Sequence, residues 1–181
     1  MFEALTAWLA PMLCFTMDEA WLNRFPGDQG SVHLRHFPDV PREWRNGALA
    51  DKWRKVRQVR RVVTGALEIE RKEGRIGSSL EAAPKVYVAD KELRAALSGV
   101  DLAEIAITSG ARLLPGDGPA NAFRLDDVKG VAVVFERAKG TKCARSWKIL
   151  EEVGTDPDFP ELSLRDAAAV RQFDARRAAA E

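Results

Sequence analysis

Hydrophobic positions in the first part of the chain recur at helical spacing. The first such row is Phe2, Leu5, Leu9 and Leu13. Pro11 interrupts this row and is expected to kink or end the helix, because proline has no amide hydrogen to donate. Thr16-x-x-Glu19 then has the form of a capping box, which predicts a second short helix over about residues 17–25.

The longest periodic stretch predicts a single helix over about residues 48–73. Gly74 is expected to end this helix in a left-handed conformation, while Gly65 is a weak point inside it. The prolines and glycines of residues 26–47 indicate an irregular connection before the helix begins. The apolar face of the helix is predicted to consist of Trp53, Val56, Val59, Val63, Ala66 and Leu67.

From about Pro84 the pattern changes to short apolar runs. Residues 85–88 and 131–137 predict strands, and residues 90–97 predict a short helix between them. Residues 102–108 are predicted to form a further strand. Mixed strands and helices of this length indicate a small α/β unit.

These elements predict an α+β fold with two parts. A helical domain is expected over residues 1–83, followed by a small α/β domain over residues 84–181. The second domain is expected to end in a knuckle and a C-terminal helix over residues 167–180. The turn-rich loop at residues 115–119 lacks the strand-to-helix placement of a phosphate-binding loop, so no nucleotide site is assigned to it.

The long helix also carries a basic face opposite its apolar one. Arg54, Arg57 and Arg61 recur at i, i+3 and i+7, and Lys55 lies toward the edge. Residues 52–61 include six basic residues and no acidic one. Most charge runs are solvated faces. Arginines at this spacing are also suited to follow phosphates along an RNA stem, because each guanidinium presents a fork of donors.

The segment from Lys142 to Trp147 looks like a zinc knuckle without its zinc. Structural zinc sites usually take four ligands, often from two Cys-x-x-Cys pairs. Here the two pairs are Cys143-x-x-Ser146 and Ser163-x-x-Asp166. A neutral hydroxyl is a poor zinc ligand, so these degenerate positions are expected to bind no metal.

The second degenerate pair also has the form of a helix start. Ser163 is expected to act as the N-cap, with Asp166 near the positive end of the helix dipole. A small apolar cluster is expected to organise the knuckle in place of a metal. Its predicted members are Trp147, Ile149, Phe159 and Leu162.

Several of these motifs together resemble the C-terminal end of bacterial isoleucyl-tRNA synthetases. The knuckle frame with its tryptophan and the segment Ile-Gly-Ser-Ser-Leu-Glu-Ala at residues 76–82 carry the most specific part of the resemblance. It extends upstream through Trp-Leu-Ala-Pro at residues 8–11, Phe-Thr-Met-Asp-Glu-Ala-Trp at 15–21, and Ser-Val-His-Leu at 31–34. The resemblance therefore covers nearly the whole chain.

The resemblance implies that this region engages the anticodon arm of isoleucine tRNA. It also implies that the remainder of the synthetase polypeptide activates and transfers isoleucine, and that ATP and magnesium are needed only there. The ATP-handling signatures His-Ile-Gly-His and Lys-Met-Ser-Lys-Ser are absent from this sequence, so no catalytic residue and no cofactor are expected here, and the chain by itself should be inactive. The candidate RNA contacts are Arg54, Lys55, Arg57, Arg61, Lys142, Arg145, Trp147 and Lys148.

Composition limits the kind of RNA surface and the cellular compartment that are expected. The net charge is +1, so any RNA surface must come from local clustering. Two cysteines fit a reducing cytoplasm, and no apolar run reaches the ~20 residues that would span a bilayer. The first apolar row begins without a capping residue, which is expected of a piece of a longer polypeptide, although a free-standing product is also compatible.

Two other functions are compatible with the sequence. One is a free-standing RNA-binding paralogue of the synthetase region, and the other is a protein-interaction module whose basic helix binds an acidic partner. The role of Trp147 is also open, because it is suited either to stack on a base of the anticodon loop or to form the core of the metal-free knuckle.

Overall fold

The computed structural model describes residues 1–27 and 30–179. The chain divides into two compact units, Met1–Gly47 and Ala48–Glu181. The α+β fold class is confirmed, because both units are built on helices and the second also contains β-sheet. Among the described residues, no helix has both the length and the apolar character needed to cross a membrane.

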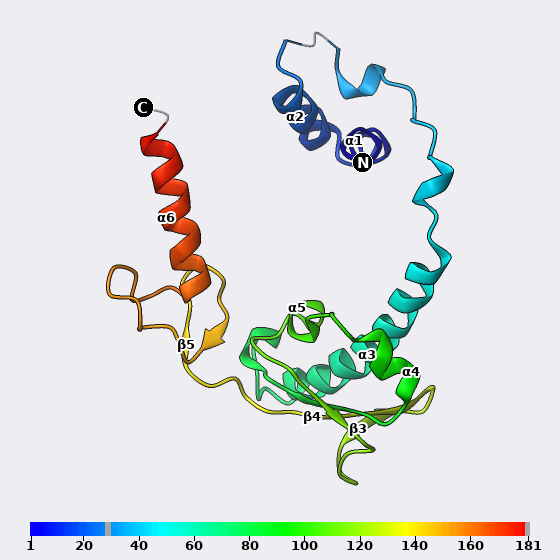
Figure 1. Cartoon of the computed structure of the whole chain (residues 1–181), viewed down its shortest axis with the longest axis vertical. Coiled ribbons are helices and arrows are strands. Elements are labelled where there is room, and N and C mark those ends of the chain that lie inside the picture. Colours follow the sequence, from blue (N-terminus) through cyan, green and yellow to red (C-terminus); the bar gives the residue numbers. More distant parts are fainter. Residues whose placement is uncertain (28–29, 180–181) are drawn as a thin grey trace. The chain divides into compact units, whose positions relative to one another are not determined.

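The first unit is a small helical assembly (Figure 1). Its helix α1 (Phe2–Leu9) ends just before Pro11, as predicted, and α2 (Cys14–Arg24) follows after a turn. The predicted capping box at residues 16–19 is wrong, because α2 begins at Cys14 without a side-chain cap. The irregular connection includes two 3-10 helices, Val32–Leu34 and Arg42–Trp44. The core of this unit consists of Ala10, Trp21 and Val32, with Met17 and Phe25 packed against it.

The second unit is organised around α3 (Gly47–Lys72), which confirms the long predicted helix. Gly74 follows it with φ 69°, the left-handed conformation expected at a helix end. Packing explains the glycine at position 65, since a Cβ there would lie only 3.0 Å from the Phe123 ring. Trp53 is 36% exposed and lies outside the buried face. That face consists of Val56, Val59, Val62, Val63, Ala66 and Leu67.

A four-stranded sheet packs against the apolar face of α3 (Figure 1). Its strand order is β2-β1-β4-β3, with β1 parallel to β2 and the other pairs antiparallel. Two cross-strand pairs, Val86 with Val133 and Val88 with Val131, belong to the same core as the valines of α3. The strands are β1 (Lys85–Val88), β2 (Arg112–Pro115), β3 (Phe123–Leu125) and β4 (Val128–Val134).

Two short helices connect β1 to β2. The helix α4 (Lys91–Ala96) was predicted, whereas the strand predicted at 102–108 is wrong and α5 (Leu102–Ala106) occupies most of that stretch. The carboxylate of Asp101 accepts hydrogen bonds from the amides of Ala103 and Glu104. This local cap favours a helix over the strand that the apolar residues alone suggest.

The knuckle segment begins with β5 (Thr141–Lys142) and β6 (Ile149–Leu150), and α6 (Leu164–Ala178) follows it. The predicted N-cap is confirmed, since the Ser163 hydroxyl accepts from the Asp166 amide at 3.2 Å. Residue 180, the last in the predicted helix, lies outside the described residues. The core of the segment is Cys143, Val153, Leu162 and Ala167, with Leu150, Phe159 and Val170 packed against it.

This knuckle core differs from the predicted cluster in two of its members. Phe159 and Leu162 belong to it, but Trp147 and Ile149 do not. Trp147 is 62% exposed, so its ring does not supply the apolar interior of the knuckle. The thiol of Cys143, which is fully buried, lies there instead.

The predicted division after residue 83 does not coincide with the division between compact units. The units divide at Gly47 and Ala48. The reason is that α3 buries its valines against β1 and β4, so that helix and sheet share one core.

Candidate nucleic-acid interface

The basic face of α3 is partly neutralised by acidic residues from elsewhere in the second unit. Lys55 Nζ donates to Glu92 at 2.6 Å, and Arg61 donates to Asp127 at 2.5 Å. Glu92 and Asp127 are far from α3 in the sequence. Residues 52–61 contain no acidic residue, but the folded chain brings carboxylates next to them.

The first arginine of this face has a nearby acid as well. Arg54 pairs with Asp51, one turn earlier on the same helix, at 2.6 Å. Arg57 is exposed and takes part in no ion pair within the described part of the chain. The hydrogen bond to Glu92 raises the pKa of Lys55, and the hydrogen bond from Arg61 lowers the pKa of Asp127, because each bond stabilises the charged form. Such exposed pairs contribute little stability, and a phosphate can exchange for the carboxylate.

The tip of the knuckle presents an aromatic ring beside a cation. The ammonium of Lys142 lies 5.0 Å from the centre of the Trp147 ring, within the range of a cation–π contact. Trp147 has φ 63°, a left-handed conformation that is uncommon for a residue with a side chain. The ring is 62% exposed at this turn.

The other two basic candidates at the knuckle differ in exposure. Arg145 keeps a 60% exposed side chain and lies 4.0 Å from Asp166. Lys148 is only 18% exposed and pairs with Glu104 of α5. Lys148 therefore joins the knuckle to α5, and its charge already has a partner.

The four positions of the degenerate zinc frame meet at one point. The thiol of Cys143 donates to the Asp166 carboxylate at 3.2 Å, and the Ser163 hydroxyl donates to the same carboxylate at 2.9 Å. The Ser163 amide points at the Cys143 sulfur at 3.3 Å. The Ser146 hydroxyl is shielded from solvent and has no hydrogen-bond partner of ordinary geometry among the described residues.

The ionisation of Asp166 and Cys143 follows from this cluster. Burial raises the pKa of Asp166, but nearby polar side chains, Ser146 first, and the charge of Arg165 outweigh it and lower the pKa to about 2. Burial likewise raises the pKa of the Cys143 thiol, and contacts from Ser146 and from backbone amides lower it below its usual range. The cluster is thus built around a buried carboxylate that stays charged.

The donor set of this cluster does not fit zinc. One thiol, two hydroxyls and one carboxylate fall short of the thiolates and imidazoles of structural zinc sites. In residues 1–27 and 30–179, no three His, Cys, Asp or Glu side chains are grouped to hold a metal ion. In this cluster the thiol of Cys143 and the hydroxyl of Ser163 both donate to the Asp166 carboxylate.

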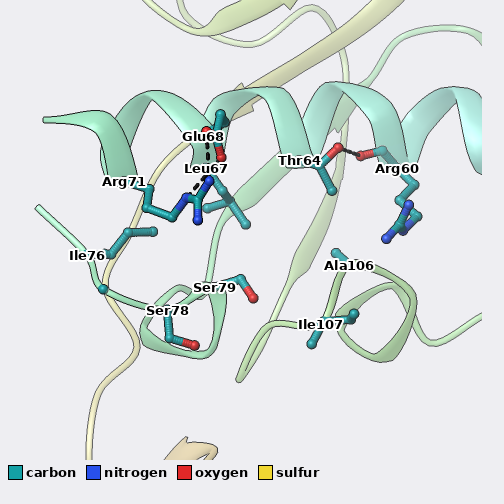
Figure 2. Close-up of a pocket in the computed structure, with 11 residues that line it drawn as sticks. Arg60, Thr64, Leu67, Glu68, Arg71, Ile76, Ser78, Ser79, Ala106 and Ile107 are labelled. Atoms are coloured by element: carbon teal, nitrogen blue, oxygen red, sulfur yellow. Dashed lines mark hydrogen bonds and ion pairs between the residues drawn. The ribbon is translucent and has the colours of Figure 1, made fainter. Parts of the chain in front are cut away.

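A pocket of about 320 Å³ lies between α3, the turn at residues 76–79 and the end of α5 (Figure 2). Its lining combines two arginines, Arg60 and Arg71, with three hydroxyls, those of Thr64, Ser78 and Ser79. The sequence patterns did not single out Arg60 and Arg71, because these arginines lie between the apolar and basic faces assigned to the helix. Ser78 and Ser79 belong to the motif at 76–82, which was the one signal that pointed to this region.

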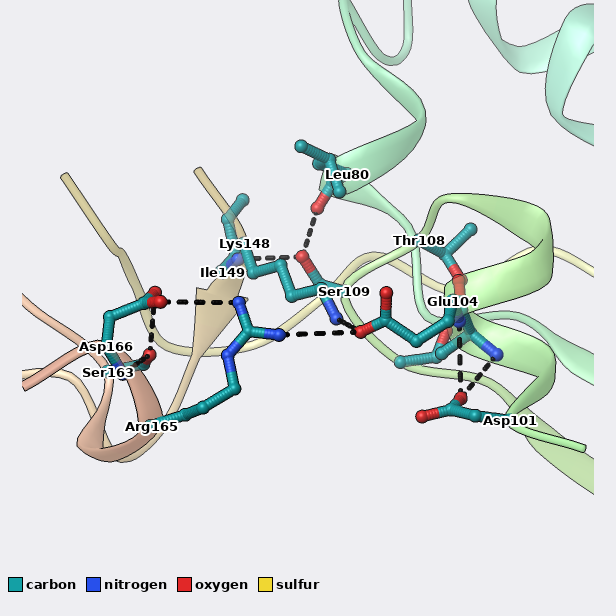
Figure 3. A network of polar contacts seen from close by, with 12 residues as sticks. Leu80, Asp101, Glu104, Thr108, Ser109, Lys148, Ile149, Ser163, Arg165 and Asp166 are labelled. Atoms are coloured by element: carbon teal, nitrogen blue, oxygen red, sulfur yellow. Dashed lines mark hydrogen bonds and ion pairs between the residues drawn. The ribbon is translucent and has the colours of Figure 1, made fainter. Parts of the chain in front are cut away.

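A polar network joins the knuckle to the rest of the second unit (Figure 3). The Ser109 hydroxyl donates to the Leu80 carbonyl at 2.5 Å and accepts from the Ile149 amide at 2.7 Å. Glu104 adds a second link, since it pairs with both Lys148 and Arg165. The knuckle is thereby linked to the motif that contains Leu80 and to α5.

Comparison with known proteins identifies the family of the helical part. The family model described as the anticodon-binding domain of tRNA ligase matches residues 1–87. Residues 1–87 belong to this family. The match includes the whole first unit, α3, the pocket-lining turn and most of β1, and it confirms the family to which the motifs of the sequence pointed.

Curated relatives extend the similarity to nearly the full chain. The isoleucine–tRNA ligase of Brucella abortus biovar 1 (strain 9-941) is 63% identical over 174 residues, which cover 96% of this chain. Those of Agrobacterium fabrum and Caulobacter vibrioides are each 58% identical, over 96% and 97% of the chain. The match covers 18% of the length of each of these relatives. The chain thus spans less than a fifth of the curated relatives it matches.

Proposed function

We propose that this chain binds the anticodon arm of isoleucine tRNA as part of an isoleucine–tRNA ligase. In this proposal the remainder of the synthetase polypeptide carries out the chemistry in the cytoplasm, with ATP and magnesium. The chain described here supplies no catalytic group and only positions the tRNA. The similarity over 96% of the chain to isoleucine–tRNA ligases supports this assignment.

The observation that carries the proposal is the exposed ring of Trp147 beside Lys142. A tryptophan that served as the core of the knuckle would be buried, whereas this one is 62% exposed. Unstacked bases of RNA loops stack on such rings, and each stack contributes about 1 to 3 kcal/mol. Lys142 and Arg145 are exposed on the same segment and are suited to hold the adjacent phosphates.

The helix α3 is proposed to contact the backbone of the stem. Arg57 is the strongest candidate because no carboxylate competes for it within the described residues. Arg54, Lys55 and Arg61 must first exchange an exposed ion pair for a phosphate, which costs little. Lys148 is the weakest of the candidates because it is shielded and paired.

The test of the knuckle contact is Trp147→Leu, measured as the affinity for isoleucine tRNA. Leucine keeps apolar bulk and loses the stacking face, so affinity should fall about 5- to 150-fold while the melting temperature holds. Trp44→Leu, at a 45% exposed tryptophan of the first unit, is the matched control and should bind normally. Full affinity in a folded Trp147→Leu variant would refute the stacking role.

The test of the helix is the combined variant Arg54→Ala, Arg57→Ala and Arg61→Ala, titrated from low to moderate salt. Its affinity should fall for all tRNAs, and the slope of log affinity against log salt should flatten by roughly 0.7 to 0.9 for each phosphate that is no longer neutralised. Arg112→Ala removes an exposed arginine of β2 as a control. An unchanged slope would remove α3 from the RNA surface.

A further inference from the structure

The pocket of about 320 Å³ beside α3 has the size of a small-ligand site, and none of the roles proposed above uses it (Figure 2). Its charged side chains are Arg60, Arg71 and Glu68. Two positive charges and one negative charge leave a net charge of +1, so the pocket favours an anion. Glu68 is not free to oppose that anion, because both of its oxygens accept from Arg71 at 2.9 and 3.0 Å.

Arg60 is oriented toward this space by the backbone. Its Nε donates to the Ile105 carbonyl at 2.8 Å, which anchors the guanidinium across the gap between α3 and α5. Its terminal nitrogens make no hydrogen bond or ion pair within the part of the chain that the structure describes. An anchored guanidinium with free terminal donors is suited to a phosphate, because less side-chain freedom is lost on binding.

Ile107 places an exposed apolar side chain at the other wall of the pocket. It is 56% exposed and has φ 56°, in the left-handed region that β-branched residues rarely adopt. It follows the last turn of α5, a position where glycine or asparagine is usual. Such a conformation is strained, and strained residues of this kind cluster at binding sites.

Ser79 completes the lining with a hydroxyl that has no partner. The residue is half-buried, and its hydroxyl makes no hydrogen bond within residues 1–27 and 30–179. Its neighbour Ser78 differs, since that hydroxyl accepts from the Leu80 amide. The pocket therefore offers one free hydroxyl between a cationic wall and an apolar wall.

We propose that this pocket holds one unstacked nucleotide of the bound RNA. The base or ribose packs against Ile107, the phosphate meets Arg60, and Ser79 bonds a polar edge of the nucleotide. This inference rests on the proposed function, since it names a second place where the same RNA is bound. RNA loops and bends expose single bases that fit such pockets, whereas a paired stem does not.

The decisive variant is Ile107→Gly in the full chain, with isoleucine tRNA as the ligand. Glycine adopts a left-handed φ freely, so the melting temperature should stay the same or rise. Removal of the side chain eliminates the apolar surface that the nucleotide would bury, so affinity should fall by about five-fold or more. Ile107→Asn, which also tolerates this conformation, should behave in the same way. Normal affinity in both variants would overturn the proposal that the pocket holds a nucleotide.

A second variant, Arg60→Gln, tests the phosphate contact. It should lower affinity and flatten the salt dependence by roughly 0.7 to 0.9, whereas Arg112→Gln, outside the pocket, should change neither. If Arg60→Gln lowers the melting temperature, photo-crosslinking of thiouridine-substituted tRNA to the wild-type chain decides instead. Crosslinks to peptides containing Ser79 or Ile107 support the pocket, and crosslinks confined to Trp147 overturn it.

These outcomes separate the two proposals. A wild-type chain that binds no tRNA overturns the proposed function and the pocket together. A wild-type chain that binds tRNA and loses affinity in Trp147→Leu, but not in the Ile107 or Arg60 variants, keeps the function and overturns the pocket alone.

Discussion

The α3–sheet core and the knuckle lie in the same compact unit but are stabilised in different ways. The α3–sheet core joins the valines of α3 to those of β1 and β4 in one apolar cluster. Among the described residues, the knuckle core has four buried members, one of them Cys143, and hydrogen bonds to the buried Asp166 carboxylate lie beside it. The difference teaches that a segment with a small apolar core can combine it with a buried polar cluster.

The largest effect should come from restoring zinc ligands at the knuckle. Because the four frame positions already converge, the combined variant Ser146→Cys, Ser163→Cys and Asp166→Cys should bind one zinc per chain. Structural zinc binding contributes on the order of 10 kcal/mol in small domains. Elemental analysis and thermal melts with and without chelator measure it.

The wild-type chain is the control for this prediction. It should carry no stoichiometric zinc, and chelator should leave its melting temperature unchanged. One zinc per wild-type chain would contradict the idea that hydrogen bonds replace the metal. A triple-cysteine variant that folds but binds no zinc would contradict the convergence of the four positions.

The α3–sheet core should respond most to loss of apolar volume. Leu97→Ala removes a side chain that is 3% exposed in this core, and unfolding free energy should fall by about 2 to 5 kcal/mol. Denaturant titration at neutral and mildly acidic pH measures the loss, which should be the same at both. A loss that varied strongly with pH would contradict the expected difference, because the α3–sheet core would then depend on charge as the knuckle does.

The knuckle should respond to pH through Asp166. Its pKa is lowered to about 2 in the folded chain, so its stabilisation is fully present above the ordinary value near 3.8 and is lost as pH falls through about 2. Asp166→Asn should cost about 1 to 2 kcal/mol near neutral pH. The difference between wild type and variant should shrink as denaturant titrations move below pH 4. A constant difference would show that shape, not charge, matters at this position.

The smallest effect should appear where the two regions meet. Ser109→Ala removes the hydroxyl that bonds Leu80 and Ile149, and this should cost about 1 kcal/mol. Amide hydrogen exchange should become faster at Ile149 and stay unchanged in β1. Equal acceleration in both would mean that the knuckle and the sheet unfold together.

Much of the helical architecture could be predicted from local signals. The long apolar row predicted α3, Gly74 predicted its end, and Ser163 predicted the start of α6, because each depends on residues within a turn or two. The strand predicted at 102–108 failed for a local reason too, since the cap at Asp101 outweighed the apolar composition.

The candidate site was less accessible to this reasoning. Basic positions along α3 were visible in the sequence, but Glu92 and Asp127, which partly neutralise them, come from distant segments. Arg60 and Ile107 gained a shared pocket only when α5 folded beside α3. No spacing within the sequence reports contacts between elements so far apart.

By itself, the sequence determined the helix periods, the caps and the motifs that mark the tRNA ligase family, because these depend on short-range spacing. The tertiary structure alone decided which charges have partners, why Trp147 is exposed, and how Cys143, Ser146, Ser163 and Asp166 form one cluster. The physical reason is that burial and electrostatic pairing act through space. They are set by the packing of the whole unit and not by neighbours along the chain.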